Sequence, residues 1–337
     1  MDWFEKLTGF RETSYEDTRG KLEVKGGRLR STVNGASYGI GALELASLQA
    51  LRERAKASSA LPGRLKVNVV TGDVRRMHHS PDNAGALFQV ASQFNLLEMV
   101  SPDVTPEQGV TRYQGDSTQG PACAIAAGAA TIYRNYFAPI GEGLGQTAQR
   151  QIDGLADLGE VLSRSLSMPV SSLWKMQNGY ALATRSGLDA IAKHLGTLDT
   201  EQLDMMRGKL CIGVHSDVEV TDFTGPEKPL VSQAFCSALP VAYSRVPPSH
   251  WQPFASLVLD AAYEATMWAA VLNAKRSGSN VVFLTLLGGG AFGNDGRWID
   301  AAMRRALGIM TTFDLDVRLV SYRPPPKEMS AFVEEFR

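Results

Sequence analysis

Short apolar runs alternate with longer helical patterns along most of the chain. Apolar runs of four to eight residues predict buried strands, and apolar residues at helical spacing predict helices. We expect strands at 65–70, 86–91, 180–184, 210–215, 233–242 and 317–322, another strand starting at Val281, and helices at 41–57, 122–136, 187–195, 254–275 and 298–307. Strands that alternate with helices of this length indicate an α/β fold whose sheet is covered on both faces.

A glycine-rich loop joins the strand that starts at Val281 to the helix at 298–307. The apolar run ends in a loop that reads Gly288, Gly289, Gly290, Ala291, Phe292, Gly293 and Asn294. Glycine lets a backbone approach a ligand closely, and the free N–H groups of a loop and a helix start favour anions such as a diphosphate. We therefore expect a ligand-binding loop. The alternative is a tight turn that binds nothing.

Two further segments lack regular periodicity. Residues 1–30 are polar and irregular and predict a surface arm, and almost thirty residues separate the strand at 86–91 from the helix at 122–136. A structureless connection of that length in a compact domain is usually functional or disordered.

Composition narrows the class of protein. The 337 residues are 44% hydrophobic and 20% charged, with a net charge of −1, as in a globular protein of one large or two small domains. No basic excess is present, so we expect no nucleic-acid partner. No apolar signal core or run of membrane-spanning length is evident, so we expect no membrane association and a cytoplasmic protein, or one delivered into a host cytoplasm. The three cysteines and five histidines are scattered, which predicts packed thiols and no metal site.

Three segments, in this order, resemble the macrodomain, an ADP-ribose-binding fold. KVNVVTGDV at 66–74 is similar to its opening strand and Gly-Asp turn, and ALFQVASQFNLLEM at 86–99 occupies the place of its next strand and ligand loop. LTLLGGGAFGND at 284–295 is similar to the diphosphate loop of poly(ADP-ribose) glycohydrolases. The resemblance implies a macrodomain-like three-layer α/β/α sandwich with a mixed sheet, a helical N-terminal extension and helical insertions. It further implies an arm and helix at 1–62, an ADP-ribose-binding domain at 63–323 and a tail at 324–337.

The chain also departs from the family pattern. The usual Asn-Ala-Ala-Asn run is replaced by residues 89–92, QVAS, and the glycine triplet after it by Leu96, Leu97 and Glu98. The adjacent glutamate pair of a glycohydrolase has no counterpart, so its catalytic carboxylates cannot be transferred by position. In this respect the chain is closer to a divergent bacterial-effector branch that removes ADP-ribose from arginine, including arginine of ubiquitin.

Cleavage at the anomeric carbon of ribose passes through an oxocarbenium-like transition state, which calls for carboxylates. The long connection supplies four candidates: Glu98, Asp103, Glu107 and Asp116. Glu98 follows the Gln93-Phe94-Asn95 segment closely, Asp116 stands just before a helix, and Glu107 lies near the position of one glycohydrolase glutamate. Each has the alternative role of a solvated loop charge or a helix cap.

The resemblance also implies a set of ligand-binding residues. In macrodomains the aspartate of the Gly-Asp turn accepts a hydrogen bond from the adenine amino group, and here that residue is Asp73. The set comprises Asp73, Val74, Gln93, Phe94, Asn95, Gln119, Gly288, Gly289, Gly290, Ala291, Phe292, Gly293 and Asn294. A turn cap for Asp73, core packing for both phenylalanines and helix caps for Gln119 and Asn294 are the alternatives.

We therefore expect an ADP-ribosylhydrolase that needs no cofactor, has ADP-ribose as ligand and product, and acts on ADP-ribosyl-arginine of a protein, with ubiquitin as a candidate. A non-catalytic ADP-ribose reader and a nucleotide or nucleotide-sugar hydrolase are the alternatives.

Residues 35–39 match the G-x-S-x-G motif around Ser37, but only a short strand and a polar arm precede them, which disfavours a serine hydrolase.

Overall fold

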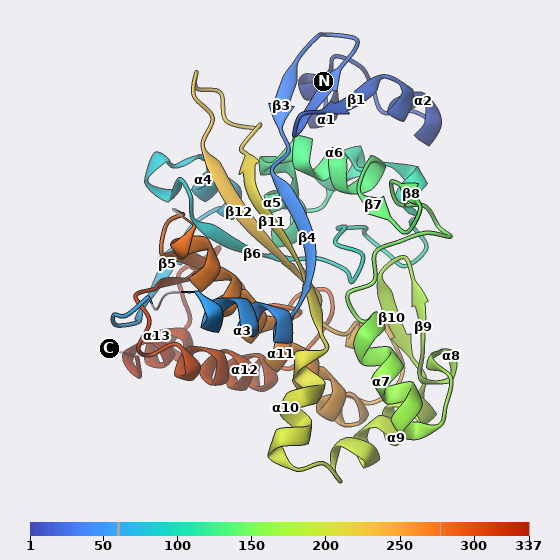
Figure 1. Cartoon of the computed structure of the whole chain (residues 1–337), viewed down its shortest axis with the longest axis vertical. Coiled ribbons are helices and arrows are strands. Elements are labelled where there is room, and N and C mark those ends of the chain that lie inside the picture. The colour runs from blue at the N-terminus through green and yellow to red at the C-terminus, as the bar shows by residue number, and fades with distance from the viewer. Residues whose placement is uncertain (59–60, 277, 337) are drawn as a thin grey trace.

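The core of the protein is a seven-stranded mixed sheet. The computed structural model describes residues 1–58, 61–276 and 278–336. The sheet has the order β4 (Ala42–Ser47), β11 (Cys211–Glu219), β12 (Leu230–Cys236), β6 (Leu87–Ala91), β13 (Val281–Leu284), β14 (Asp316–Ser321) and β5 (Lys66–Thr71) (Figure 1). The strands from β12 to β5 are parallel to one another, whereas β11 pairs antiparallel with both of its neighbours, β4 and β12. The carboxyl ends of all strands of this sheet except β11 therefore share one edge.

Helices cover both faces of this sheet. One face packs against α3 (Leu48–Ala57), α11 (Pro248–Lys275) and α12 (Gly296–Ile309), and the other against α4 (Val74–His79), α5 (Gln119–Ala126) and α6 (Gly128–Tyr136). In β6, Leu87 belongs to the first core, and Phe88 and Val90 belong to the second. This alternation places one apolar set on each face. The predicted three-layer α/β/α arrangement with a mixed sheet is confirmed.

The long helix α11 is the central helix of the first face. Within residues 1–58, 61–276 and 278–336, it is the one helix with the length and composition to cross a membrane, so the expectation that no apolar run approaches this length is wrong. However, 83% of its most apolar window is buried inside the protein, as in a core helix. The feature is therefore weak evidence for a membrane span.

Residues 139–208 form an insertion against α11. It comprises β7 (Pro139–Ile140), β8 (Gly143–Leu144), α7 (Ala156–Leu166), α8 (Val170–Leu173), β9 (Trp174–Gln177), β10 (Tyr180–Ala183), α9 (Arg185–Leu195) and α10 (Thr200–Gly208). The strand predicted at 180–184 belongs to the β9–β10 hairpin instead of the central sheet. Asn178 and Gly179 both have positive φ, the backbone that a two-residue hairpin turn requires.

The N-terminal extension has a core of its own, so the prediction of an irregular surface arm is wrong. It contains α1 (Trp3–Thr8), α2 (Tyr15–Gly20), β1 (Leu22–Lys25), β2 (Arg28–Ser31) and β3 (Ser37–Gly39), and its three strands form a small antiparallel sheet. Phe4 and Leu7 pack with Leu97 and Val110 of the long connection and with Ile132 of α6. Apolar residues spaced too far apart for a periodic pattern therefore meet across the fold.

The motif around Ser37 is not a nucleophile elbow. Ser37 lies in the peripheral strand β3, and its Oγ accepts a hydrogen bond from Nε of Arg28 at 3.0 Å. No helix follows it directly, because β4 comes next.

Two predicted helices differ from the observed elements. Residues 42–47 form the edge strand β4 instead of the start of a helix, because Gly41 has φ +70° and Leu43 and Leu45 pair with β11. The helix α3 begins only after Ser47, whose side chain accepts from the N–H of Ala50. The helix predicted at 122–136 is divided into α5 and α6 at Ala127.

Other predicted elements lie close to the observed ones. The strand predicted at 233–242 ends at Cys236, and a short 3-10 turn, Val241–Tyr243, follows. Residues 324–337 contain α13 (Lys327–Glu334), and the connection between β6 and α5 contains 3-10 turns at Pro106–Gln108 and Thr111–Gly115. A further 3-10 turn, Pro81–Asn83, precedes β6.

We predict that Glu12 holds the long connection against the N-terminal extension. Its carboxylate accepts from the N–H groups of Val110 (2.9 Å) and Thr111 (2.6 Å) and from the Tyr136 hydroxyl (2.8 Å). Glu12→Ala leaves these buried donors unpaired and should lower the free energy of unfolding by about 1–3 kcal/mol in denaturant titrations. Glu23→Ala, on the exposed side of β1, is the matched control, and an equal loss in both variants would refute the role.

Candidate functional site

The candidate site is a pocket of about 330 Å³ at the carboxyl end of the central strands. The pairing of β6 with β13 ends at Phe88 and Phe283. Beyond it, the side chain of Gln89 accepts from Thr285 N–H at 3.2 Å and so links the two chain segments. The walls of the pocket come from the loop after β6, the start of α5, the segment after β12 and the glycine loop. This is the position at which open α/β sheets bind ligands.

The glycine loop forms one wall of the pocket. Gly288 has φ +75°, and a Cβ there would lie 2.4 Å from Cβ of Ala238, so only glycine fits. Among the hydrogen bonds of the residues that the structure describes, none uses the backbone N–H groups of Gly288, Gly290, Ala291 or Phe292. Four donors of one loop are therefore available to an anion.

The loop after β6 forms the opposite wall and is held by side chains. The carboxamide oxygen of Gln93 accepts from Met99 N–H at 2.7 Å, and the Tyr180 hydroxyl donates to the Met99 carbonyl at 2.6 Å. Gln119 accepts from Ala91 N–H at 2.9 Å and donates to the Gln89 carbonyl at 2.8 Å. Gln93 and Gln119 line the pocket, but their carboxamide groups form hydrogen bonds to the backbone of the protein.

Glu98 is a buried acid in the pocket wall. The residue is 2% exposed, and both carboxyl oxygens accept no hydrogen bond from the residues that the structure describes. Burial raises the pKa of Glu98 to about 8, against the lowering effect of Arg134. At neutral pH this carboxyl therefore holds its proton, as a general acid requires.

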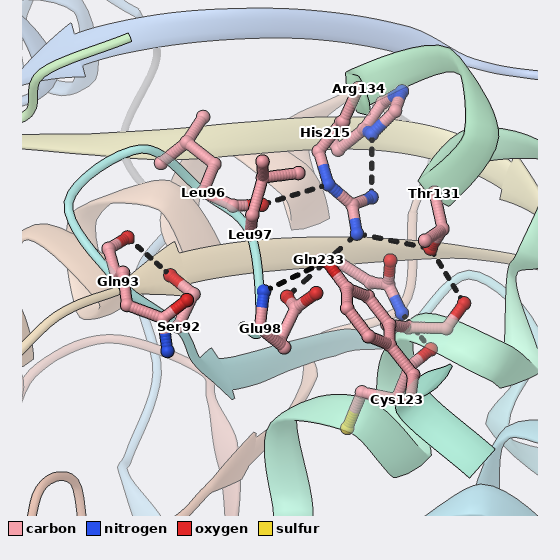
Figure 2. A network of polar contacts seen from close by, with 12 residues as sticks. Ser92, Gln93, Leu96, Leu97, Glu98, Cys123, Thr131, Arg134, His215 and Gln233 are labelled. Carbon is pink, nitrogen blue, oxygen red and sulfur yellow. Dashed lines mark hydrogen bonds and ion pairs between the residues drawn. The ribbon is translucent and has the colours of Figure 1, made fainter. Parts of the chain in front are cut away.

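Behind Glu98 lies a buried polar network, shown in Figure 2. Arg134 of α6 is fully buried, and its Nη2 lies 3.8 Å from Oε1 of Glu98. Its guanidinium donates to the Leu96 carbonyl (3.1 Å) and the Thr131 hydroxyl (3.1 Å) and contacts Nδ1 of His215 (3.4 Å). Burial and Arg134 keep the pKa of His215 far below its ordinary value, so His215 accepts this contact in its neutral form.

Asp116 is the second acid that lines the pocket. Its Oδ1 accepts from Thr118 N–H at 2.8 Å, which fixes it just before α5. The N-cap residue of α5 is Thr118, so Asp116 has the pocket role and not the helix-cap role that the sequence left open.

Three aromatic rings form another part of the wall. The ring of Tyr180 lies 5.1 Å from that of Tyr243 and 5.2 Å from that of Phe292, and the last two are 5.7 Å apart. All three residues line the pocket. Their faces offer stacking surface and favour cations.

Solved structures with a similar arrangement are known, although no family model and no curated protein matches the chain. A poly(ADP-ribose) glycohydrolase from Deinococcus radiodurans in complex with ADP-ribose has 14% identity and a TM-score of 0.45, over 87% of this chain and 93% of that one. A poly(ADP-ribose) glycohydrolase from Thermomonospora curvata has 14% identity and a TM-score of 0.44, over 92% and 94%. Likeness at this level does not extend to function.

Asp103 and Glu107 lie outside the pocket, contrary to the expectation that the loop acids converge. Oδ1 of the exposed Asp103 accepts from Nε2 of Gln177 at 3.0 Å, and Oε1 of Glu107 accepts from Ala148 N–H at 2.9 Å. Between these two acids, Val104 packs in the N-terminal core. Both acidic side chains instead contact the insertion at 139–208.

Asp73 and Val74 also line neither this pocket nor the neighbouring cavity described below. Asp73 caps α4, because its Oδ1 accepts from Arg75 N–H at 2.8 Å, and Val74 is buried in the second core. Phe94 packs in the first core. Asn95 is fully buried, accepts from Leu97 N–H at 3.1 Å and donates to Gln151 at 2.9 Å.

The glycine loop separates the pocket from a second cavity of about 920 Å³ between the loop, α12 and α13. Gly290 lines both cavities, and Ala291 and Phe292 line the pocket. Gly289 and Asn294 line the second cavity, and Asn294 also donates to the Leu239 carbonyl at 2.8 Å. Gly293, with φ +68°, turns the chain beside Ala242.

Sequence reasoning missed several pocket residues. Tyr180 and Tyr243 line the pocket but belong to no motif, and their segments are remote in sequence from the glycine loop. Thr285 lies in the motif at 284–295 but was not among the predicted site residues. Arg134 had a usable signal, since it is the one charged residue between Pro121 and Phe137. A lone charge in an apolar helix is expected to have a buried partner.

Metal binding has little support in the side chains present. Within the described parts of the chain, no group of three or more histidine, cysteine, aspartate or glutamate side chains is arranged to hold a metal ion.

We predict that Gly120 controls how closely α5 approaches Glu98. A Cβ at Gly120 would lie 1.9 Å from the Ala91 carbonyl oxygen and 3.1 Å from Cγ of Glu98. Because a backbone atom must move, Gly120→Ala should destabilise the protein by about 1–3 kcal/mol in thermal or chemical unfolding. Gly115→Ala has open space around its Cβ and is the matched control. Equal stability of the two variants would contradict this packing.

Proposed function

We propose that this protein is an ADP-ribosylhydrolase that cleaves the bond between ADP-ribose and a protein side chain. One observation is the main support: Glu98, a buried acid, lines the same pocket as a glycine loop with four unused backbone N–H groups among the described residues. The loop fits a diphosphate, and the acid fits the scissile bond at the anomeric carbon. The segments that resemble a macrodomain give the same assignment.

The pocket holds only part of such a ligand. Its volume of about 330 Å³ suits the diphosphate and the distal ribose. In this proposal the diphosphate binds the N–H groups of Gly288, Gly290, Ala291 and Phe292, and the distal ribose lies against Glu98. The adenosine half then extends over Leu286 and Gly290 toward the second cavity, which these two residues also line.

Glu98 acts as the general acid in this proposal. With a pKa of about 8 it is protonated at neutral pH and donates its proton to the leaving group as the glycosidic bond breaks. Positive charge then develops on the ribose ring, and the ionised Glu98 lies beside it. Asp116, the second acid of the pocket, orients the water that attacks the anomeric carbon, and the proton that this water releases goes to the ionised Glu98, which restores the acid.

We propose arginine as the acceptor side chain, and ubiquitin as one protein that presents it. The rings of Tyr180, Tyr243 and Phe292 adjoin Asp116 in the pocket wall, and burial together with Tyr243 and Asp116 raises the pKa of Tyr180. Aromatic faces beside a carboxylate favour a guanidinium group. The sequence resemblance to arginine-specific effectors supports the same choice.

The proposal is tested by incubating the protein with substrates that carry ADP-ribose on arginine, glutamate or serine, and with poly(ADP-ribose), and measuring free ADP-ribose. We expect release from the arginine-linked protein, including ubiquitin. Glu98→Gln should reduce the rate by about 10²- to 10⁴-fold, whereas the exposed Glu142→Gln should not. Above pH 8, kcat/KM should fall about tenfold per pH unit as Glu98 loses its proton.

Two results would oppose the proposal. Binding of ADP-ribose with no release from any substrate identifies a reader. Full turnover in Glu98→Gln removes Glu98 from the reaction.

The glycine loop gives an independent binding prediction. Gly288→Ala places a side chain on a backbone with positive φ and against Ala238, so the loop must change shape. A strain of 1–2 kcal/mol corresponds to about tenfold weaker ADP-ribose binding by calorimetry. Gly296→Ala, with open space at the start of α12, is the control and should bind normally. If Gly288→Ala retains full affinity, the diphosphate does not bind this loop.

A further inference from the structure

We propose that Arg134 is a positioning residue for the reaction. It fixes the Glu98 carboxyl in the pocket wall and stabilises the ionised form of that carboxyl. This inference rests on the proposed function, because it assigns Glu98 a chemical role. Arg134 lines no part of the pocket and reaches the ligand only through Glu98.

The Arg134 guanidinium is rigidly held. It contacts the Leu96 carbonyl, the Thr131 hydroxyl and His215 Nδ1 (Figure 2). It also lies 3.8 Å from the centroid of the Phe235 ring. These contacts come from three separate parts of the fold, namely the loop after β6, α6 and the two strands β11 and β12. A guanidinium with hydrogen bonds along its edges and a ring against one face has little freedom to move with a partner.

Arg134 also shapes the turn that delivers Glu98. Leu96 has φ +63°, a left-handed backbone that a leucine rarely adopts. Nε of Arg134 donates to the carbonyl of this same residue at 3.1 Å. Two residues later the chain reaches Glu98, so the bond stabilises the strained turn that directs Glu98 into the pocket wall.

The carboxyl of Glu98 has few other partners. The charged and titratable groups that face it are Tyr113 of the 3-10 turn at Thr111–Gly115, Asp116, Cys123 of α5 and Arg134 of α6, with His215 of β11 behind Arg134. Within the parts of the chain that the structure describes, Arg134 is the one cation among them. The Tyr113 hydroxyl accepts from Glu98 N–H at 3.0 Å and also lowers the pKa of the carboxyl, so Arg134 and Tyr113 are the two groups that favour its ionised form.

These contacts give Arg134 a defined effect on chemistry. Burial opposes ionisation of Glu98, and the charge of Arg134 partly offsets this. A general acid has to release its proton during the reaction, and without Arg134 the ionised product form would be a buried, unpaired charge. Loss of Arg134 should therefore slow the chemical step and leave ligand binding intact.

The experiment compares the wild type with Arg134→Met and Arg134→Lys. Titration of Glu98 is followed by NMR of ¹³C-labelled glutamate, with Glu98→Gln to assign its signal. In Arg134→Met the midpoint should rise by about one to three pH units from about 8, and in Arg134→Lys it should stay closer to the wild type. With the proposed substrate, kcat should fall tenfold or more in Arg134→Met, and the affinity for ADP-ribose should change less than threefold.

Each result has a defined meaning. An unchanged Glu98 midpoint in folded Arg134→Met overturns the inference, as does a loss of affinity that accounts for the whole loss of rate. If Arg134→Met does not fold, Arg134→Lys decides, because it keeps the charge but loses the three-way hydrogen bonding. A reduced kcat with near-normal titration then supports positioning, and an unchanged kcat overturns it. A wild type that releases no ADP-ribose refutes the proposed function, and the titrations still test the coupling.

Discussion

The burial of one carboxyl group, Glu98, is the constraint on which the pocket depends. Withdrawing a carboxyl from water strongly disfavours its ionised form, so a buried acid is either neutral or paired with a cation. Here both effects operate, because burial raises the pKa of Glu98 and Arg134 lowers it. Arg134 is itself fully buried and needs partners of its own, which Leu96, Thr131 and His215 supply. One acid thus accounts for a polar network that extends from the pocket to β11.

The site is assembled from distant segments that hold one another in place. The N-terminal extension supports the long connection through Glu12, and the connection places Tyr113 against the backbone of Glu98. The insertion contributes Tyr180, which fixes Met99 beside the same acid. Irregular backbone needs such partners, since its polar groups lack the ladder of a sheet or helix. The extension and the insertion therefore act as supports for the loop that contains Glu98.

The sequence predicted the parts of this architecture that local patterns determine. Apolar runs identified β5, β6, β13 and β14, and the glycines identified the loop after β13, because strand burial and positive φ leave direct marks on a sequence. The edge strand β4 was missed since its residues 42–47 also fit a helical pattern, and only pairing with β11 decides between the two. The N-terminal core was missed because its apolar residues cluster with residues of the long connection and α6, which are remote in the sequence. Long-range contacts of this kind have no local signature.

The difference between local patterns and long-range contacts also explains why the sequence could not rank the candidate acids. Four carboxylates lie in the long connection, and sequence spacing alone could not separate them. The structure separates them by the environment of each carboxyl. Glu98 is buried without a hydrogen bond, Asp116 lines the pocket and accepts from Thr118 N–H, and Asp103 and Glu107 bond to the insertion. A buried acid without hydrogen bonds is costly for folding, and functional sites are where proteins retain such costs. Glu98 lines the same pocket as a glycine loop with unused N–H donors, so in the proposed function the cost of burying this acid is offset by its role as a general acid.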